Sequence, residues 1–313
     1  MIILIILCLG RLGSSLQGRF ERLGEIADLH EAITVQEQAV GLTPDGHPGK
    51  SQCFNNLGAS LRTWLRHQPD DVTLGRAISA YSQSANSSHC PPFVHFTAAR
   101  MWATLSSSVH SREALDAYST LISLIPHIVW LGRTVEQRYE DISSIGDAVS
   151  DAAASAISFG ETGLALEWLG LGRSILWGQD LQLRAPADAL RQHHPNEVDV
   201  LEELSRALGS TCTVQAPDHS THSTPDESKS PEEAAQYEGI VKHLRSLPGF
   251  AEFLQPKKSA PLCSVAVSGP VVIVNAHKTR SDALVLLPLS SQVHVALPGL
   301  QVSDLSRMQL CKV

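Results

Sequence analysis

The sequence predicts a mainly α-helical protein: a solenoid of paired helices, a helical linker, and a short β-hairpin near the C-terminus. Three observations predict this class. A block of residues recurs within the first hundred positions, helical patterns fill roughly the first 255 residues, and a β-run begins only at Val271. Alanine and leucine are abundant and only 5% of the residues are aromatic, a composition that favours helices.

Charge and cysteine usage narrow the functional classes. The net charge is −8, and no Lys/Arg cluster is longer than Lys257-Lys258, so we expect no nucleic-acid partner. The six cysteines are isolated, with no CxxC pair, which indicates reduced thiols rather than a disulfide framework. These features predict a cytoplasmic protein.

The apolar N-terminus MIILIILCLG is shorter than the roughly 20 residues that a membrane-spanning helix needs. No basic residue precedes it and no A-x-A-like cleavage site follows it. We therefore expect it to start the first helix, with no membrane association. A signal peptide or anchor, and an imperfect translation start, remain alternatives.

The repeat is defined by a shift of 45 residues (57 − 12). Leu12-Gly13-x-x-Leu16 recurs as Leu57-Gly58-x-x-Leu61, Leu29 recurs as Leu74, and Ala32-Ile33 recurs as Ala77-Ile78. In each unit we expect the glycine to allow close approach between a first helix and its partner. We expect the second helices at Leu29–Val40 and Leu74–Ala85, each followed by a turn that contains helix breakers, Thr43–Gly49 or Ser87–Pro92.

Two helices per unit of this length are typical of an α-solenoid, and the motif resembles the tetratricopeptide repeat in a variant with longer turns. A third, degenerate unit comprises Phe96–Ser107 and Glu113–Leu124. We assign residues 1–130 to these repeats. An ordinary helical bundle is the alternative.

Beyond the repeats, residues 131–210 should extend the stack as a helical hairpin, Thr134–Phe159 closed by Gly160 and then Glu161–Leu183, followed by a charged helix at Glu197–Leu208. Residues 211–231 lack hydrophobic periodicity and predict a disordered loop. A linker helix is assigned to 232–255, with Ser230 as its N-cap.

Strands are predicted in the remainder, residues 256–313. Val271–Asn275 and Ala283–Leu287 flank a hairpin loop at His277–Asp282, and Val293–Leu297 is a third candidate. Valine and leucine scarcely alternate with polar residues in the first two, which is typical of strands covered on both faces.

Several segments together resemble fungal CHAT-domain proteins with tetratricopeptide repeats: Ala114–Leu131, Glu167-Trp168-Leu169, Gly172-Arg173-Ser174, Trp177-Gly178-Gln179 and Gly269–Asn275. The resemblance implies a caspase-like α/β domain, related to separase, with a His/Cys dyad. In that family the histidine lies in a His-Gly motif and the cysteine follows a small residue on a later strand. Neither motif occurs here, so the resemblance implies a CHAT domain truncated at its C-terminus, with 256–313 as its N-terminal fragment.

No catalytic, cofactor-binding or metal-binding residue is therefore predicted. His277, Cys263 and Cys311 are weak substitutes for the dyad. His89-Cys90 and His193-His194 lack partner ligands at metal spacing. Arg173, Trp177 and Gln179 are expected to make structural or inter-domain contacts.

These observations favour a protein-interaction scaffold without enzyme activity, which binds a protein or peptide on the concave solenoid face. The alternative is a fragment of a CHAT-family cysteine peptidase whose catalytic histidine and cysteine lie beyond Val313.

Overall fold

The structure is a computed structural model that describes residues 2–47, 49–87, 90–130, 135–178, 190–191, 194–211, 229–251, 253, 266, 269–288 and 291–300. Over these residues the protein is mainly helical, with a small three-stranded antiparallel sheet near its C-terminus. The chain divides into two compact units, residues 1–132 with 199–243, and residues 133–198 with 244–313. The prediction of a mainly helical protein with a short β-segment is confirmed.

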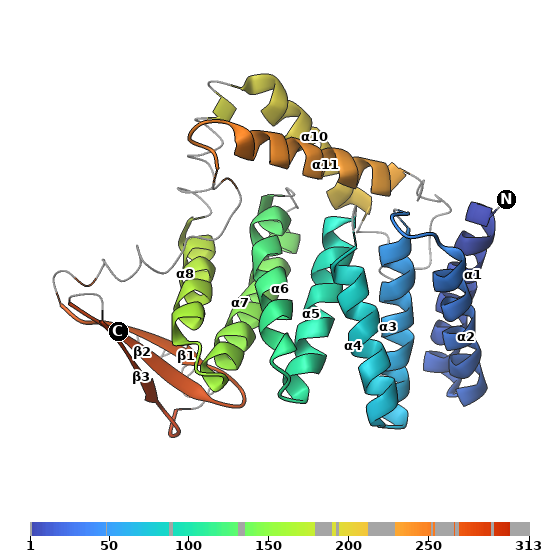
Figure 1. The fold of residues 1–313 in the computed structure, drawn as a ribbon, viewed down its shortest axis with the longest axis horizontal. Helices are drawn as coiled ribbons and strands as arrows, with labels where there is room; N and C mark the ends of the chain where they lie inside the picture. The colour runs from blue at the N-terminus through green and yellow to red at the C-terminus, as the bar shows by residue number, and fades with distance from the viewer. Residues whose placement is uncertain are drawn as a thin grey trace. The chain divides into compact units, whose positions relative to one another are not determined.

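The first unit begins with six helices in three consecutive pairs (Figure 1). The pairs are α1 (Ile2–Leu23) with α2 (Ile26–Leu42), α3 (Lys50–His67) with α4 (Asp71–Ala85), and α5 (Pro92–Ser108) with α6 (Glu113–Trp130). Packing is most extensive within each pair and continues from α2 to α3 and from α4 to α5. In this unit, the four helices that the sequence predicts with bounds, α2, α4, α5 and α6, are present, and each is a few residues longer than predicted.

The repeated glycines lie where a side chain of the second helix of the pair packs directly against the first helix. A Cβ atom at Gly58 would lie 2.9 Å from the ring of Tyr81, and one at Gly13 would lie 2.6 Å from Cγ of Gln36. Gln36 and Tyr81 are themselves one repeat apart (81 − 36 = 45). The predicted close approach is therefore confirmed in both pairs.

The second helix of each pair buries the same three positions, spaced by four and then three residues. These are Ala32, Gln36 and Ala39 in α2, Ala77, Tyr81 and Ser84 in α4, and Ala114, Tyr118 and Leu121 in α6. The third pair keeps this burial pattern although its sequence identities are degenerate. Small residues at the first position let the helices approach each other, and the larger second residue fills the space beside them.

Charges at the helix ends follow the helix dipole. The last turns of α1 and α3 carry Arg22 and Arg66, and the first turns of α4 and α6 carry Asp71 and Glu113. Before α4, Asp70 accepts a hydrogen bond from the backbone N–H of Thr73 at 2.7 Å and caps the helix.

The apolar N-terminal residues belong to α1, as predicted. Ile6 is buried and packs with Ala39 of α2 and Cys53 of α3. Among the helices in the described ranges, none is both long and apolar enough to cross a membrane.

Two further helices, α10 (Pro195–Thr211) and α11 (Lys229–Ser246), have residues in both units. α11 begins at Lys229, so the prediction that Ser230 is its N-cap is wrong, because Ser230 lies inside the helix. Residues 212–228, which include most of the predicted disordered loop, lie outside the described residues.

The second unit contains a helical hairpin, α7 (Val135–Ser158) with α8 (Thr162–Gly178). Gly160 closes α7 with a φ of +80°, a left-handed conformation in which glycine ends many helices. Gly172 of α8 lies against Val149 of α7, where a Cβ atom would come within 2.8 Å of the valine side chain.

The sheet of the second unit is a meander of β1 (Val271–Ala276), β2 (Ser281–Leu287) and β3 (Ser291–Ala296), in that order. Residues 277–280 form the turn between β1 and β2, which is two residues shorter than the predicted loop because β2 already begins at Ser281. The third strand, which the sequence left as a candidate, is present.

The two faces of the sheet differ. Ile273, Leu284 and Leu286 are buried on the face toward α7, which contacts β1. Val272 and Val274 of β1 lie on the other face and are 55% and 40% exposed. The prediction that β1 is covered on both faces is therefore wrong, because its burial alternates with period two. The central strand β2 is buried at most positions, as predicted.

Candidate functional site

An open groove lies along α3 and α4 in the first unit, with a volume of about 440 Å³. Phe54, Leu57 and Leu61 of α3 line it, spaced so that they share one face of the helix. The groove is completed by residues of α4, namely Val72, Gly75, Arg76, Ser79, Ala80 and Gln83. Its size is within the range of about 300–1,000 Å³ that is usual for ligand pockets.

Small residues on α4 keep this groove open. Gly75 has no atom within 4 Å of the place where its Cβ would lie. One repeat earlier the equivalent residue is His30, whose ring packs edge-on against Trp64 with centroids 6.2 Å apart. The glycine therefore leaves space at a position that a side chain occupies in the preceding pair.

The rim of the groove is polar and partly charged. Arg76 forms an ion pair with Glu37 of α2, and both side chains are about half exposed. An ion pair at such a surface contributes little free energy, so Arg76 is able to exchange Glu37 for another carboxylate at low cost. Val72 is 75% exposed, the largest exposure among the large, exposed hydrophobic side chains of the described residues.

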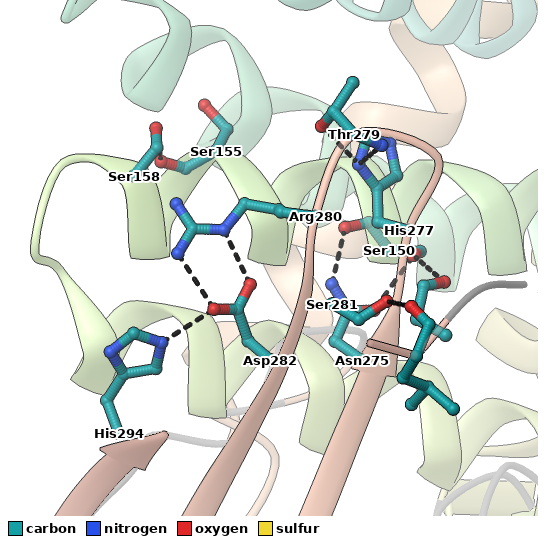
Figure 2. Close-up of polar contacts among 12 residues, drawn as sticks. Ser150, Ser155, Ser158, Asn275, His277, Thr279, Arg280, Ser281, Asp282 and His294 are labelled. Carbon is teal, nitrogen blue, oxygen red and sulfur yellow. Dashed lines mark hydrogen bonds and ion pairs between the residues drawn. The ribbon is translucent and has the colours of Figure 1, made fainter. Parts of the chain in front are cut away.

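A second candidate site, a polar cluster, lies in the second unit between α7 and the sheet (Figure 2). The hydroxyl of Ser150 donates to Oδ1 of Asn275 at 2.9 Å, and Nδ2 of Asn275 donates to the backbone carbonyl of Ser150 at 3.1 Å. Asn275 is almost fully buried, so this reciprocal pair satisfies an amide that would otherwise be costly to bury. Nε2 of Gln292 on β3 adds a hydrogen bond to the carbonyl of Thr162 in α8 at 2.9 Å.

His277 lies in the β1–β2 turn and is bound through both ring nitrogens. Nδ1 contacts Oγ1 of Thr279 at 2.9 Å and accepts from the backbone N–H of Thr279, so Nε2 carries the proton that it donates to Asp151 of α7 at 2.8 Å. The ring therefore anchors the turn to the helix. This geometry gives His277 a structural role.

Asp282 is the most deeply buried carboxylate of this cluster. Arg280 donates to both of its oxygens, at 2.6 and 2.8 Å, and Nε2 of His294 donates to Oδ1 at 2.7 Å (Figure 2). Burial alone would raise the pKa of Asp282, but the hydrogen bonds from Arg280 and His294 outweigh it and hold the pKa below its ordinary value. The carboxylate is therefore a charged centre that organises β2 and β3.

The buried cysteines among the described residues are poorly suited to act as nucleophiles. Cys53 and Cys90 are buried, and burial raises the pKa of both thiols, that of Cys90 to about 12. Cys8 is exposed on α1. Cys263 and Cys311, the two cysteines considered as dyad substitutes, lie outside the described residues.

Of the residues considered as metal ligands, Cys90 and His194 lie in the part of the chain that the structure describes. His194 lies 3.7 Å from Glu197, and no group of three side chains suited to a metal is found among the described residues. His89 and His193 lie outside them.

Of the three residues expected to make structural contacts, Arg173 and Trp177 belong to α8. Their side chains lie outside the described part of the structure, as does the whole of Gln179. Their predicted role stays a prediction.

Sequence reasoning missed both sites. The sequence pattern places Asp282 in a loop and His294 in a strand. A charged residue at the start of an apolar strand is nevertheless a signal for a buried ion pair. Asn275 gave a similar signal, since it ends a run of four apolar residues. For the groove, the only signal was Gly75 in the middle of a helix.

No family model matches the chain, and no curated protein or solved structure shows significant similarity to it. The candidate sites therefore stand on their geometry alone.

Proposed function

We propose that this chain is a protein-interaction scaffold of the tetratricopeptide type, and that the groove along α3 and α4 binds an apolar segment of a partner protein. The observation that carries the proposal is the groove itself, an open volume of about 440 Å³ with Phe54, Leu57 and Leu61 at its apolar wall. The paired helices, with their repeated glycine contacts, support the solenoid architecture.

The lining defines the chemistry of the expected segment. Burial of one or two bulky apolar side chains against the α3 wall supplies the affinity. Ser79 and Gln83 offer hydrogen bonds at the rim, and Arg76 offers a charge-assisted bond to a carboxylate beside the apolar anchor. The expected ligand is thus a short peptide with a large apolar residue followed or preceded by Asp or Glu.

The groove can be closed without steric conflict. Gly75→Met places a flexible apolar side chain where no atom lies within 4 Å, so the fold should tolerate it. Gly41→Met is the matched control, because Gly41 is also an exposed helical glycine with open space around it and does not line the groove.

The test uses an array of 12-residue peptides in which the apolar anchor and the neighbouring charge are varied systematically. Peptides with a Leu, Phe or Trp anchor beside a carboxylate should bind the full chain. Gly75→Met should weaken this binding at least about tenfold, and Gly41→Met should leave it unchanged. Equal binding by both variants, or no binding up to about 1 mM, would overturn the proposal.

The alternative function is that of a fragment of a cysteine peptidase whose catalytic histidine and cysteine lie beyond Val313. It concerns residues outside this chain and stays a prediction.

A further inference from the structure

The outer side of α1 exposes three positions that are buried one repeat later. They are Cys8, Leu12 and Ser15, and the 45-residue shift carries them onto Cys53, Leu57 and Ser60 of α3. Leu12 is 46% exposed, whereas Leu57 is 8% exposed. Ile5, three residues before Cys8, is 44% exposed and extends the same side of the helix. We call Ile5, Cys8, Leu12 and Ser15 the outer face of α1.

The equivalent residues of α3 are covered by α2. Cys53 clusters with Ala39, and Val40 packs against this cluster. Val40 and Ile33 also pack against the cluster that contains Leu57. The second helix of one repeat unit therefore covers this side of the first helix of the next unit. Because α1 and α3 are related by the repeat, a helix of the same kind fits the outer face of α1.

Two of the three second helices in this chain are already packed between first helices. α2 contacts both α1 and α3, and α4 contacts both α3 and α5. The third, α6, contacts α5, and its exposed side chains between residues 113 and 125 are all polar, namely Glu113, Asp116, Ser119 and Ser123. Over the residues that the structure describes, a second copy of the chain therefore offers no apolar second helix for the outer face of α1.

Two α1 helices would also be a poor match for each other. α1 and α3 are both first helices, and they contact each other much less than either contacts α2. The stacking interface of this fold thus pairs a first helix with a second helix. An isolated apolar residue at a surface is normal, but several on one side of a helix mark an interaction surface.

We propose that the outer face of α1 binds one amphipathic helix of a partner protein, whose contact stripe repeats that of α2. The stripe has a β-branched residue and, six and seven positions later, a small residue and a second β-branched residue, as in Ile33, Ala39 and Val40. Positions seven apart lie on one side of a helix, so both branched residues reach the same surface. This surface is separate from the groove on α3 and α4.

Fluorescence anisotropy of a defined probe tests the proposal. The probe is a labelled, acetylated peptide with the sequence of residues 26–42, which form α2. The control peptide carries Ile33→Ser and Val40→Ser, which keep its length and charge and change its helix propensity little. The probe should bind the full chain at least about tenfold more tightly than the control peptide.

Variants of the chain then locate the binding. Leu12→Glu should weaken binding of the probe at least about tenfold, because it places a charge in the apolar contact. Leu7→Glu is the matched control, since Leu7 is 41% exposed on the same helix but lies about 140° around it from Leu12. Leu7→Glu and Gly75→Met, which fills the groove, should bind the probe as the unmodified chain does.

Cys8 gives a second readout of the same surface. It is exposed and lies between Ile5 and Leu12 on the outer face, and the probe contains no cysteine. Saturating probe should therefore slow iodoacetamide labelling of Cys8 at least about fivefold, and the control peptide at the same concentration should not.

Four results would overturn the proposal. One is binding that Leu12→Glu retains or that Leu7→Glu loses equally. Another is unchanged labelling of Cys8 at saturation, which would place the peptide on α3 in exchange for α2, or in the groove. The third is absence of binding up to about 1 mM. The fourth is a doubling of mass in sedimentation equilibrium that Leu12→Glu abolishes, because a second copy would then cover the face.

Discussion

The ring of Tyr81 fills the space in which any side chain at Gly58 would have to lie, 2.9 Å from the position of its Cβ. The ring is buried and Gly58 lies in the middle of α3, so neither group has room to move without shifting a helix. This contact sets the distance between α3 and α4.

Gly58→Ala should therefore destabilise the first unit by about 2 kcal/mol through overpacking, although alanine is the better helix former. Urea unfolding followed by far-UV circular dichroism measures the change. Gly18→Ala, with no atom within 4 Å of its Cβ, is the control and should be neutral or stabilising by up to about 1 kcal/mol. Similar effects at both glycines would show that the Tyr81 contact does not limit the spacing.

A substitution at Gln36 should stabilise the protein, in contrast to the destabilisation expected for Gly58→Ala. The amide of Gln36 is buried, and neither Oε1 nor Nε2 has a hydrogen-bond partner among the residues that the structure describes. Gln36→Met keeps the length of the side chain and removes the unsatisfied groups, so it should raise the free energy of unfolding by roughly 1–2 kcal/mol. Gln38→Met, at an exposed position of the same helix, should change it little. Destabilisation by Gln36→Met would mean that the amide is bonded in solution.

The capping carboxylate of α4 predicts a pH dependence. The backbone N–H of Thr73 holds the pKa of Asp70 below its ordinary value of 3.8. Since the folded-state pKa is lowered, the cap stabilises the protein fully above the unfolded-state pKa, and this contribution is lost as the pH falls through the folded-state pKa.

Thermal melts at pH values between 6 and 2 test this pH dependence. They compare the natural chain with the Asp70→Ala and Asp70→Ser variants. Asp70→Ala should be less stable at pH 6 and should approach the natural chain at pH 2. Asp70→Ser keeps an acceptor that does not titrate, so its deficit should be smaller at pH 6. A constant deficit of Asp70→Ala across the range would contradict the assignment of the cap.

Asp282 makes a comparable prediction for the second unit. Asp282→Asn removes the charge that Arg280 and His294 share, which should destabilise the sheet by about 2 kcal/mol. Because the pKa of Asp282 is lowered, the deficit should be present at neutral pH and diminish as the pH falls below 3.8.

Hydrogen exchange of the β2 amides is the suitable measurement for Asp282, since it reports on the sheet alone. Asp151→Asn serves as a comparison, because it keeps an acceptor for Nε2 of His277 and leaves β2 untouched. Unchanged protection of β2 in Asp282→Asn would show that the ion pairs do not stabilise the sheet.

The thiols differ in predicted reactivity. A pKa of about 12 leaves about one Cys90 thiol in ten thousand ionised at pH 8, and the group is also buried. Iodoacetamide labelling mapped by mass spectrometry should modify exposed Cys8 at least about a hundredfold faster than Cys90, and denaturant should remove the difference. Rapid labelling of Cys90 in the folded chain would contradict its burial.

The helical part of the fold could be predicted from the sequence because the residues that define a helix and its ends are close together in the chain. The 45-residue shift located the Gly13 and Gly58 contacts, and Gly160 was identified as the end of α7. Breakers and caps act within a few residues, so helix ends were predicted within a few positions.

The sites were less accessible because they depend on contacts between distant residues. Ser150 and Asn275 are 125 positions apart, and no local pattern relates them. The exposed face of β1 was missed for a related reason. An unbroken apolar run is compatible with cover on both faces or on one, and only the packing partner decides which. The α3–α4 groove results from an absent side chain at Gly75, which a sequence pattern records only as a poor helix former.

The hydrogen bonds that join the sheet to α7 and α8 have a consequence for the order of folding. They connect residues 125, 126 and 130 positions apart, whereas the close contacts of Gly13 and Gly58 each bridge 23 (36 − 13 and 81 − 58). Loops of the longer kind close slowly, so the paired helices of the first unit should form well before the sheet docks. During synthesis, Ser150 and Asp151 can form these hydrogen bonds only after the strands have been translated, more than a hundred residues later. Throughout that interval the side of α7 that will meet the sheet is open to chaperones and to competing strands.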